Sequence, residues 1–273
     1  MSARPLEAAA PPGLEGELPR WRSELGHGTR LWGGMGRTSG RHVVGADRFL
    51  TFSGVAAVDY NVVCCHGAER AALEECLGEA AALRRPVIVM AAGPALGHVA
   101  VLADAGWVCI GATPLMRLAL PSAGPLEDGP HAPARPLDRR GLGLLRQLAE
   151  AAFALPPELA ELALPEEAAL DAPGRDPALS LWGIEEDGQM LCGTALVRHD
   201  DTVTVWSMAT SPALQGRGLG RRLLSAALRA AAAEGATQCL LTSSTAGQRL
   251  YRAVGFEVLE HWQLWTRPRW VLA

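Results

Sequence analysis

The C-terminal part of the chain alternates clearly between apolar runs and polar turns. Two strand-like runs, Ala178–Glu185 and Gln189–Arg198, are separated by Glu186-Asp187-Gly188. Asp-Gly between two such runs is typical of a tight turn, so we expect an antiparallel hairpin. A further strand is expected at Thr202–Thr210, directly after His199-Asp200-Asp201.

Helical spacing of Leu and Ala frames these strands. It predicts one helix over Leu142–Phe153 and another from about Gly218 to Glu234, with Gly235 as its stop. The order from the first helix onward is therefore α, β, β, β, α, β, α, β. Its last three elements are expected at Gln238–Ser243, Thr245–Ala253 and Phe256–Thr266.

The N-terminal half repeats the last portion of this pattern, which suggests two duplicated domains. We therefore expect an α/β (α+β) fold of two tandem domains, each a mixed, mostly antiparallel sheet flanked by helices. A Pro-, Gly- and Ala-rich stretch supplies the boundary. The expected parts are a flexible arm over 1–20, a first domain over 21–120, a linker over 121–138 and a second domain over 139–273. The elements expected in the first domain are a strand at Val55–Cys65, a helix at Glu69–Leu83, a strand at Pro86–Ala91 and a helix at Ala95–Ala105.

Composition and charge exclude several classes of protein. The chain has 273 residues and a formal net charge of −4, which gives no general attraction to nucleic acid. It has no run of about 18 apolar residues, so we expect no membrane span, and a start without an apolar core suggests a cytoplasmic location. Its six cysteines lack C-x-x-C spacing, so we expect neither disulfides nor a metal site.

The most informative motif is Gln215-Gly216-Arg217-Gly218-Leu219-Gly220, between an expected strand and an expected helix. Glycines let a backbone approach an anion, and a helix start offers unpaired N–H groups. A Walker A loop is excluded because it needs a Lys and all 25 basic residues are Arg. A dinucleotide fold fits poorly, because these glycines come late in the chain and follow an antiparallel hairpin.

Two segments together, SMATSPALQGRGLGRRLL and AGQRLYRAVGFEV, resemble the GNAT superfamily of N-acetyltransferases. The resemblance covers about Leu142 to Thr266. It implies acetyl-CoA as the acyl donor and a primary amine, on a small molecule or a peptide, as the acceptor. It leaves the acceptor's identity and the oligomeric state open. The first domain is then a degenerate GNAT-like repeat, because His66-Gly67-Ala68-Glu69 replaces the glycine loop.

The resemblance also implies roles for particular residues. The backbone from Gly216 to Arg221 is expected to bind the CoA pyrophosphate, with charge from Arg217, Arg221 and Arg222. The end of the preceding strand is expected to pair with the pantetheine arm, and the Met208 N–H to stabilise the oxyanion. The full set of expected cofactor-binding residues is Met208, Ala209, Thr210, Gln215, Gly216, Arg217, Gly218, Leu219, Gly220, Arg221 and Ser244.

Tyr251 stands where the family often has a tyrosine that protonates the departing CoA thiolate, so it is the expected catalytic acid. The general base is open, because the strand before the loop carries no carboxylate. Ser243 and Ser244 stand where the family frequently has an Asn, and could instead be N-caps. The candidates for the base are Asp201, Glu257, Glu260 and His261.

Two hypotheses about function follow. The first is an acetyl-CoA-dependent N-acetyltransferase whose second domain is catalytic. The second is a non-catalytic acyl-CoA-binding or interaction protein with the same fold. The missing base and the missing Asn favour the second hypothesis, whereas Tyr251 and the intact loop favour the first.

Overall fold

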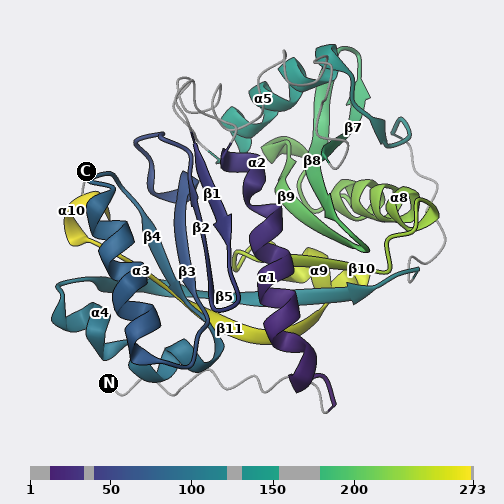
Figure 1. The fold of residues 1–273 in the computed structure, drawn as a ribbon. Coiled ribbons are helices and arrows are strands. Elements are labelled where there is room, and N and C mark those ends of the chain that lie inside the picture. The colour runs from purple at the N-terminus through teal and green to yellow at the C-terminus, as the bar shows by residue number, and fades with distance from the viewer. Residues whose placement is uncertain (1–12, 34–39, 122–130, 154–178, 272–273) are drawn as a thin grey trace. The chain divides into compact units, whose positions relative to one another are not determined.

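The computed structural model describes residues 13–33, 40–121, 131–153 and 179–271 (Figure 1). The chain divides into two compact units. The first unit comprises Met1–Met116, Thr242–Ala246 and Glu257–Ala273, and the second comprises Arg117–Leu241 and Gly247–Phe256. Two late segments of the sequence, Thr242–Ala246 and Glu257–Ala273, thus belong to the first unit.

The first unit is a mixed sheet with strands in the order β1-β2-β3-β4-β11-β5. Only β3 and β4 are parallel among the pairs described for it, whereas β11 is antiparallel to β4. Its strands are β1 (Arg41–Val44), β2 (Arg48–Phe52), β3 (Asn61–Cys65), β4 (Ile88–Ala91), β11 (Glu257–Thr266) and the first part of β5 (Val108–Ala119).

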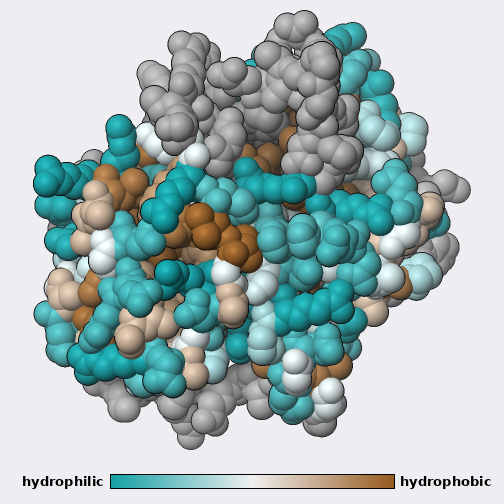
Figure 2. Space-filling model, viewed as in Figure 1, coloured by the Kyte–Doolittle hydropathy of each residue, from teal (hydrophilic) through white to brown (hydrophobic). Residues whose placement is uncertain are grey.

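Helices cover both faces of this sheet. Phe49 of β2 lies against Gly26 of α1, while its neighbour Leu50 belongs to the core under α3. Alternate residues of a strand face opposite sides, so α1 and α3 lie on opposite faces. Hydrophobic residues gather over β1 and β2 on the face drawn in Figure 2. Val43 of β1 is 43% exposed. The helices are α1 (Leu18–Gly28), α2 (Arg30–Gly33), α3 (Arg70–Ala82), α4 (Ala100–Asp104) and α10 (Pro268–Val271).

The second unit has the strand order β6-β7-β8-β9-β10, followed by the end of β5. Leu145 of α5 lies against Gly193 of β8, while the neighbouring Cys192 packs on Leu219 and Leu223 of α8. The two longer helices therefore cover opposite faces. Its elements are β6 (Arg135–Pro136), α5 (Arg139–Phe153), β7 (Leu179–Glu186), β8 (Gln189–His199), β9 (Thr202–Thr210), α8 (Leu219–Ala233), β10 (Gln238–Thr242) and α9 (Gln248–Val254).

Most expected elements of the C-terminal part are confirmed within one to three residues. The hairpin turn is confirmed too: Asp187 and Gly188 have φ of 49° and 76°, as a type I′ turn requires. Both units have a mixed, mostly antiparallel sheet flanked by helices, so the predicted fold class is confirmed. Residues 154–178, between the helix that ends at Phe153 and the strand that begins at Leu179, lie outside the described residues.

Several expectations for the N-terminal half were wrong. The strand expected from Val55 begins only at Asn61, because the Asn61 side chain donates to the carbonyls of Val55 and Ala57 and holds a turn there. The helix expected at Ala95–Ala105 is a 3₁₀ helix over Gly93–His98 followed by α4. The end of the expected arm is folded, since α1 begins at Leu18, and part of the expected linker is β6. Residues 1–12 and 122–130 lie outside the described residues.

The last strand of the chain differs most from expectation. We expected it to close the second domain, but β11 pairs with β4 of the first unit, with Gln263, Leu264 and Trp265 opposite Ala91, Met90 and Val89. Conversely, the end of β5, which comes from the N-terminal half, belongs to the second unit. There Leu120 N–H donates to Thr237 O. Each unit is therefore completed by a strand from the other half of the sequence.

Candidate functional site

The glycine loop lies in the second unit, between the end of β9 and the start of α8. Gly216 and Gly218 have φ of 77° and 81°, a left-handed conformation that side chains disfavour. Gly218 is the N-cap of α8, and no side chain caps this helix end. The stretch from Gln215 to Gly218 is exposed. The first N–H groups of α8 are therefore open to an anion, and the helix dipole favours negative charge there.

Gly220 has a different role from the two loop glycines. A Cβ at this position would lie 3.1 Å from Leu250 Cδ2 and 3.1 Å from Met208 Cε. The first turn of α8 therefore packs closely on both α9 and β9. This contact brings the loop, Met208 and the helix that carries Tyr251 together in one unit.

The strand before the loop is bulged and has an open edge. Ser207 has φ of 51°, and the register with β8 shifts between the pairs Ala195–Trp206 and Gly193–Ala209. The parallel pairs with β10 end at Thr204 and Leu240. In the described part of the second unit, the rest of β9 thus has no β10 partner, which leaves Met208 and Ala209 on a strand edge where an extended ligand can pair.

Hydrogen bonds to neighbouring elements hold the start of the loop. Ser211 N–H donates to Leu191 O at 2.9 Å, and Gln215 Nε2 donates to Thr210 O at 3.4 Å. Cys192 Sγ lies 3.2 Å from Thr210 Oγ1, and burial raises the pKa of this thiol to about 11. These bonds fix the turn by which β9 enters the loop.

Tyr251 is buried, with 8% of its surface exposed, and its ring packs edge-on against Phe256 at 5.7 Å. Burial, followed by the nearby Cys239 and Cys192, raises the pKa of this phenol well above its usual value of 10. The hydroxyl therefore keeps its proton at neutral pH. A protonated phenol in this place can act as a proton donor.

The arginines divide into two groups. Arg217 and Arg221 are exposed on the loop and the first turn of α8, consistent with contact to a bound anion. Arg222 instead donates through Nη2 to the carbonyls of His131 at 3.0 Å and Ala132 at 3.3 Å. It therefore fixes the segment before β6 against α8. Glu186 holds the same segment by accepting Ala132 N–H and bonding His131 Nδ1.

The serines expected near the cofactor lie in the other unit. Ser243 is buried, and its hydroxyl donates to Ser244 O at 2.8 Å. Both serines belong to Thr242–Ala246, which is assigned to the first unit, and Ser244 stays a predicted cofactor-binding residue. Neither caps α9, which has no side-chain N-cap.

Two of the expected candidates for the base are occupied elsewhere. Asp201 accepts from Thr237 Oγ1 at 2.7 Å beyond the far end of β9, roughly 20 Å of extended strand from Met208. Glu260 is buried in the first unit, where it binds Arg22 and Trp262. Glu257 and His261 also lie on β11 of that unit. No carboxylate stands on β9.

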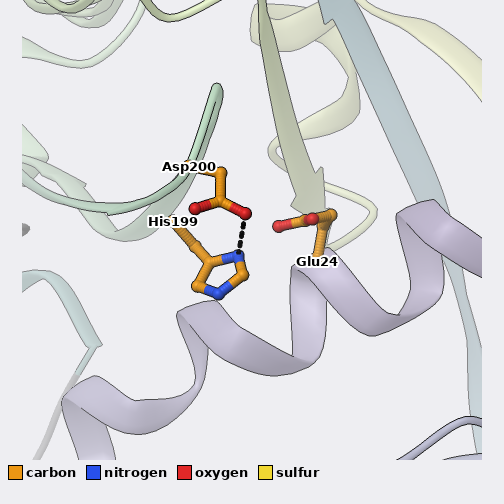
Figure 3. A group of neighbouring side chains, drawn as sticks. All are labelled: Glu24, His199 and Asp200. Carbon is orange, nitrogen blue, oxygen red and sulfur yellow. Dashed lines mark ion pairs between the residues drawn. The ribbon is translucent and has the colours of Figure 1, made fainter.

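A small group at the β8–β9 turn is drawn in Figure 3. His199 Nδ1 and Asp200 Oδ2 lie 3.9 Å apart in the second unit. Glu24, also drawn, is on α1 of the first unit. Two such residues in one unit do not define a metal site, and this turn lies at the opposite end of β9 from the loop.

Comparison with known proteins identifies the fold. Residues 177–258 match the family described as the acetyltransferase (GNAT) domain. A GCN5-related N-acetyltransferase from Kribbella flavida is 20% identical, with a TM-score of 0.66 over 92% of this chain and 95% of that chain. One from Sphaerobacter thermophilus is 17% identical, with a TM-score of 0.56 over 82% and 81%. No curated protein matches significantly. The segment 177–258 is thus a GNAT acetyltransferase domain, in a chain with the fold of these structures.

Sequence reasoning missed the Ser207 bulge, the Cys192–Thr210 bond and the open edge of β9. A serine in a strand gives no signal of positive φ, and Cys192 sits in an ordinary apolar run. The open edge depends on where β10 leaves β9. Among the described residues, no helix is long and apolar enough to cross a membrane.

Proposed function

We propose that the protein is an acetyl-CoA-dependent N-acetyltransferase that moves the acetyl group to a primary amine. The observation that carries this proposal is the arrangement in the second unit. An open helix start at Gly218, a strand edge without a β10 partner beyond Thr204 and the short helix with the buried, protonated Tyr251 meet where Gly220 packs on Met208 and Leu250. These three features match a diphosphate, an amide-containing arm and a leaving thiolate.

In the proposed mechanism, backbone N–H groups from Gly216 to Arg221 bind the pyrophosphate, with charge from Arg217 and Arg221. Gln215 and Leu219 shape the loop on either side. Met208, Ala209 and Thr210 pair with the pantetheine arm as an added strand. The named N-acetyltransferases among the similar structures support nitrogen as the acceptor atom.

The reaction is a direct transfer. The amine lone pair attacks the thioester carbonyl, and the Met208 N–H stabilises the oxyanion that forms. The C–S bond then breaks, and the thiolate takes the Tyr251 proton, while the amine nitrogen loses its extra proton to water. Water is proposed as the proton acceptor because β9 carries no carboxylate and Asp201 and Glu260 are bound elsewhere.

The missing carboxylate also favours a second candidate, an acyl-CoA-binding protein without turnover. CoA release from acetyl-CoA across a panel of polyamines, amino acids, aminoglycosides and peptides separates the two, together with calorimetric binding of CoA. Turnover on any amine supports the transferase. Binding without turnover on every amine supports the second candidate, and absence of binding contradicts both.

A matched pair of glycine variants locates the binding site. Gly218→Asp places a carboxylate and a strained φ at the start of α8, so CoA affinity should fall at least about tenfold. Gly235→Asp makes the same change at the other end of α8, where φ is 95°, and should leave CoA affinity unchanged. Equal losses in both variants would contradict a site at the loop.

A further inference from the structure

The helix that carries Tyr251 is held at both ends by segments of the first unit. The chain runs from Thr242–Ala246 of the first unit into α9, and leaves again at Glu257 into β11 of the first unit. Helix α9 has only seven residues and no side-chain N-cap. A helix this short is unstable alone, so its position depends on its packing against α8 at Gly220 and Leu250 and on what holds its ends.

The link after α9 is rigid. Phe256 N–H donates to Tyr251 O at 3.0 Å and Gly255 N–H to Arg252 O at 3.1 Å, with φ of 110° at Gly255. This is a Schellman motif, and the ring contact between Tyr251 and Phe256 is the apolar pair that accompanies it. The direction of the Tyr251 side chain is thereby tied to Phe256, the residue directly before β11.

Strand β11 is anchored deep in the first unit. Glu260 accepts from Arg22 Nε at 2.7 Å and Nη2 at 2.6 Å, and from Trp262 Nε1 at 2.7 Å. The Arg22 guanidinium lies over Gly93, where a Cβ would approach it to 2.2 Å. Farther along β11, Thr266 Oγ1 donates to Val87 O at 2.9 Å.

The link before α9 is anchored as well. Ser243 is 2% exposed and its carbonyl accepts from Thr113 Oγ1 at 3.0 Å. Its N–H donates to Pro114 O at 3.3 Å. Two separate sets of bonds within the first unit therefore fix the two ends of the segment that carries Tyr251.

We propose that the first unit positions the catalytic helix, with Glu260, Arg22 and Thr113 as positioning residues that act through the ends of α9. This inference rests on the proposed role of Tyr251. On this proposal the first unit, which has no glycine loop, contributes to catalysis by positioning α9 and not by binding a ligand. The glycine loop is not held in this way, because β9 and α8 lie wholly in the second unit.

The test uses hydrogen exchange and steady-state kinetics on the full chain. Glu260→Gln keeps an oxygen for Trp262 and removes the carboxylate bound by Arg22. We expect α9 amides to exchange at least about tenfold faster while α8 amides do not change. We expect kcat to fall about tenfold or more through misplacement of Tyr251, with the KM for acetyl-CoA within about twofold.

Two further variants keep the test decisive. Thr113→Val loosens the other end of α9 without a buried charge, and serves if Glu260→Gln does not fold. Leu73→Ala weakens the core of the first unit on α3, in the cluster that also contains Trp265 near the far end of β11, and should change α9 exchange much less than Glu260→Gln does. Faster exchange in β11 without a change in α9, or an equal change in Leu73→Ala, would overturn the proposal. Lack of turnover by the wild type would overturn the proposed function, whereas α9 exchange would still decide the positioning.

Discussion

The two units share one framework and differ at one point. In the first unit β3 and β4 are parallel and α3 connects them, and in the second unit β9 and β10 are parallel and α8 connects them. The pairing of β3 with β4 continues to Cys65 and Ala91, and Ala92 N–H donates to Cys65 O at 2.9 Å. The pairing of β9 with β10 ends at Thr204. The parallel strands of the first unit therefore stay paired up to the following loop, whereas those of the second unit separate before it.

The loops that follow these strands differ in the same sense. After β3, His66 is buried and its N–H donates to Asp47 O at 2.7 Å. A Cβ on Gly67 would lie 2.9 Å from Asp47 Cβ, so the turn is filled by protein. After β9, apart from the chain neighbours of each glycine, no atom of the described residues lies within 4 Å of a Cβ placed on Gly216 or Gly218. We infer that an anion site in this fold needs two conditions: parallel strands that separate before the loop, and loop glycines with free space beside them. We propose that the first unit is a degenerate repeat that has neither.

The largest expected effect is on kcat, and it is expected for the tyrosine of the second unit and not for that of the first. Tyr251→Phe should lower kcat by about 10²- to 10⁴-fold with no change in the KM for acetyl-CoA, because only the proton donor is lost. Tyr60→Phe is the matched control in the first unit and should leave kcat unchanged. Burial raises the pKa of Tyr251 above 10, so wild-type activity should not decline with deprotonation of this phenol below that pH. Unchanged kcat in Tyr251→Phe would exclude the role.

An intermediate effect is expected on the stability of the first unit at acidic pH. Burial, and then the charge of Arg22, lowers the pKa of His66 from 6.5 to about 4. As the pH falls, the unfolded chain protonates this imidazole before the folded chain does. The free energy of unfolding is therefore unaffected by His66 above about pH 6.5 and falls progressively between about pH 6.5 and pH 4. At pH 5 the loss is about 2 kcal/mol.

Urea unfolding at pH 7 and pH 5 measures this loss. His66→Gln should be less sensitive to acid than the wild type, and exchange should rise in β3 before β9. Burial also lowers the pKa of His42, in the same unit, to about 4, so His66→Gln should keep part of the sensitivity. Equal losses in variant and wild type would contradict the assignment to His66.

The last prediction is that a glycine-rich turn in the first unit does not create a second CoA site. Ala68→Gly combined with Glu69→Gly gives the first unit a glycine-rich turn without its acidic residue. CoA stoichiometry measured by calorimetry should stay at one per chain, because β3 and β4 remain paired to their ends. A second bound CoA would show that loop composition alone distinguishes the units.

Much of the second unit could be predicted from the sequence because its signals are local. Asp187-Gly188 defines a hairpin, the period of α8 is regular, and Gly255 ends α9 with a positive φ. In the first unit β1 and β2 were missed and the start of β3 was misplaced. Asn61 reaches backward to two carbonyls, and such a side-chain bond leaves no trace in hydropathy.

Three features of the site can be read from neighbouring residues of the sequence: a single glycine loop, a helix that starts at this loop after an antiparallel hairpin, and Tyr251 on a short helix. They are predictable because each is a local property. In contrast, the separation of β9 from β10 beyond Thr204, the bonds from Arg222 to the segment before β6 and the pairing of β11 with β4 are visible only in the folded chain. Strand partners are chosen by contacts far apart in the sequence, and the buried Arg22–Glu260 pair joins residues 238 positions apart.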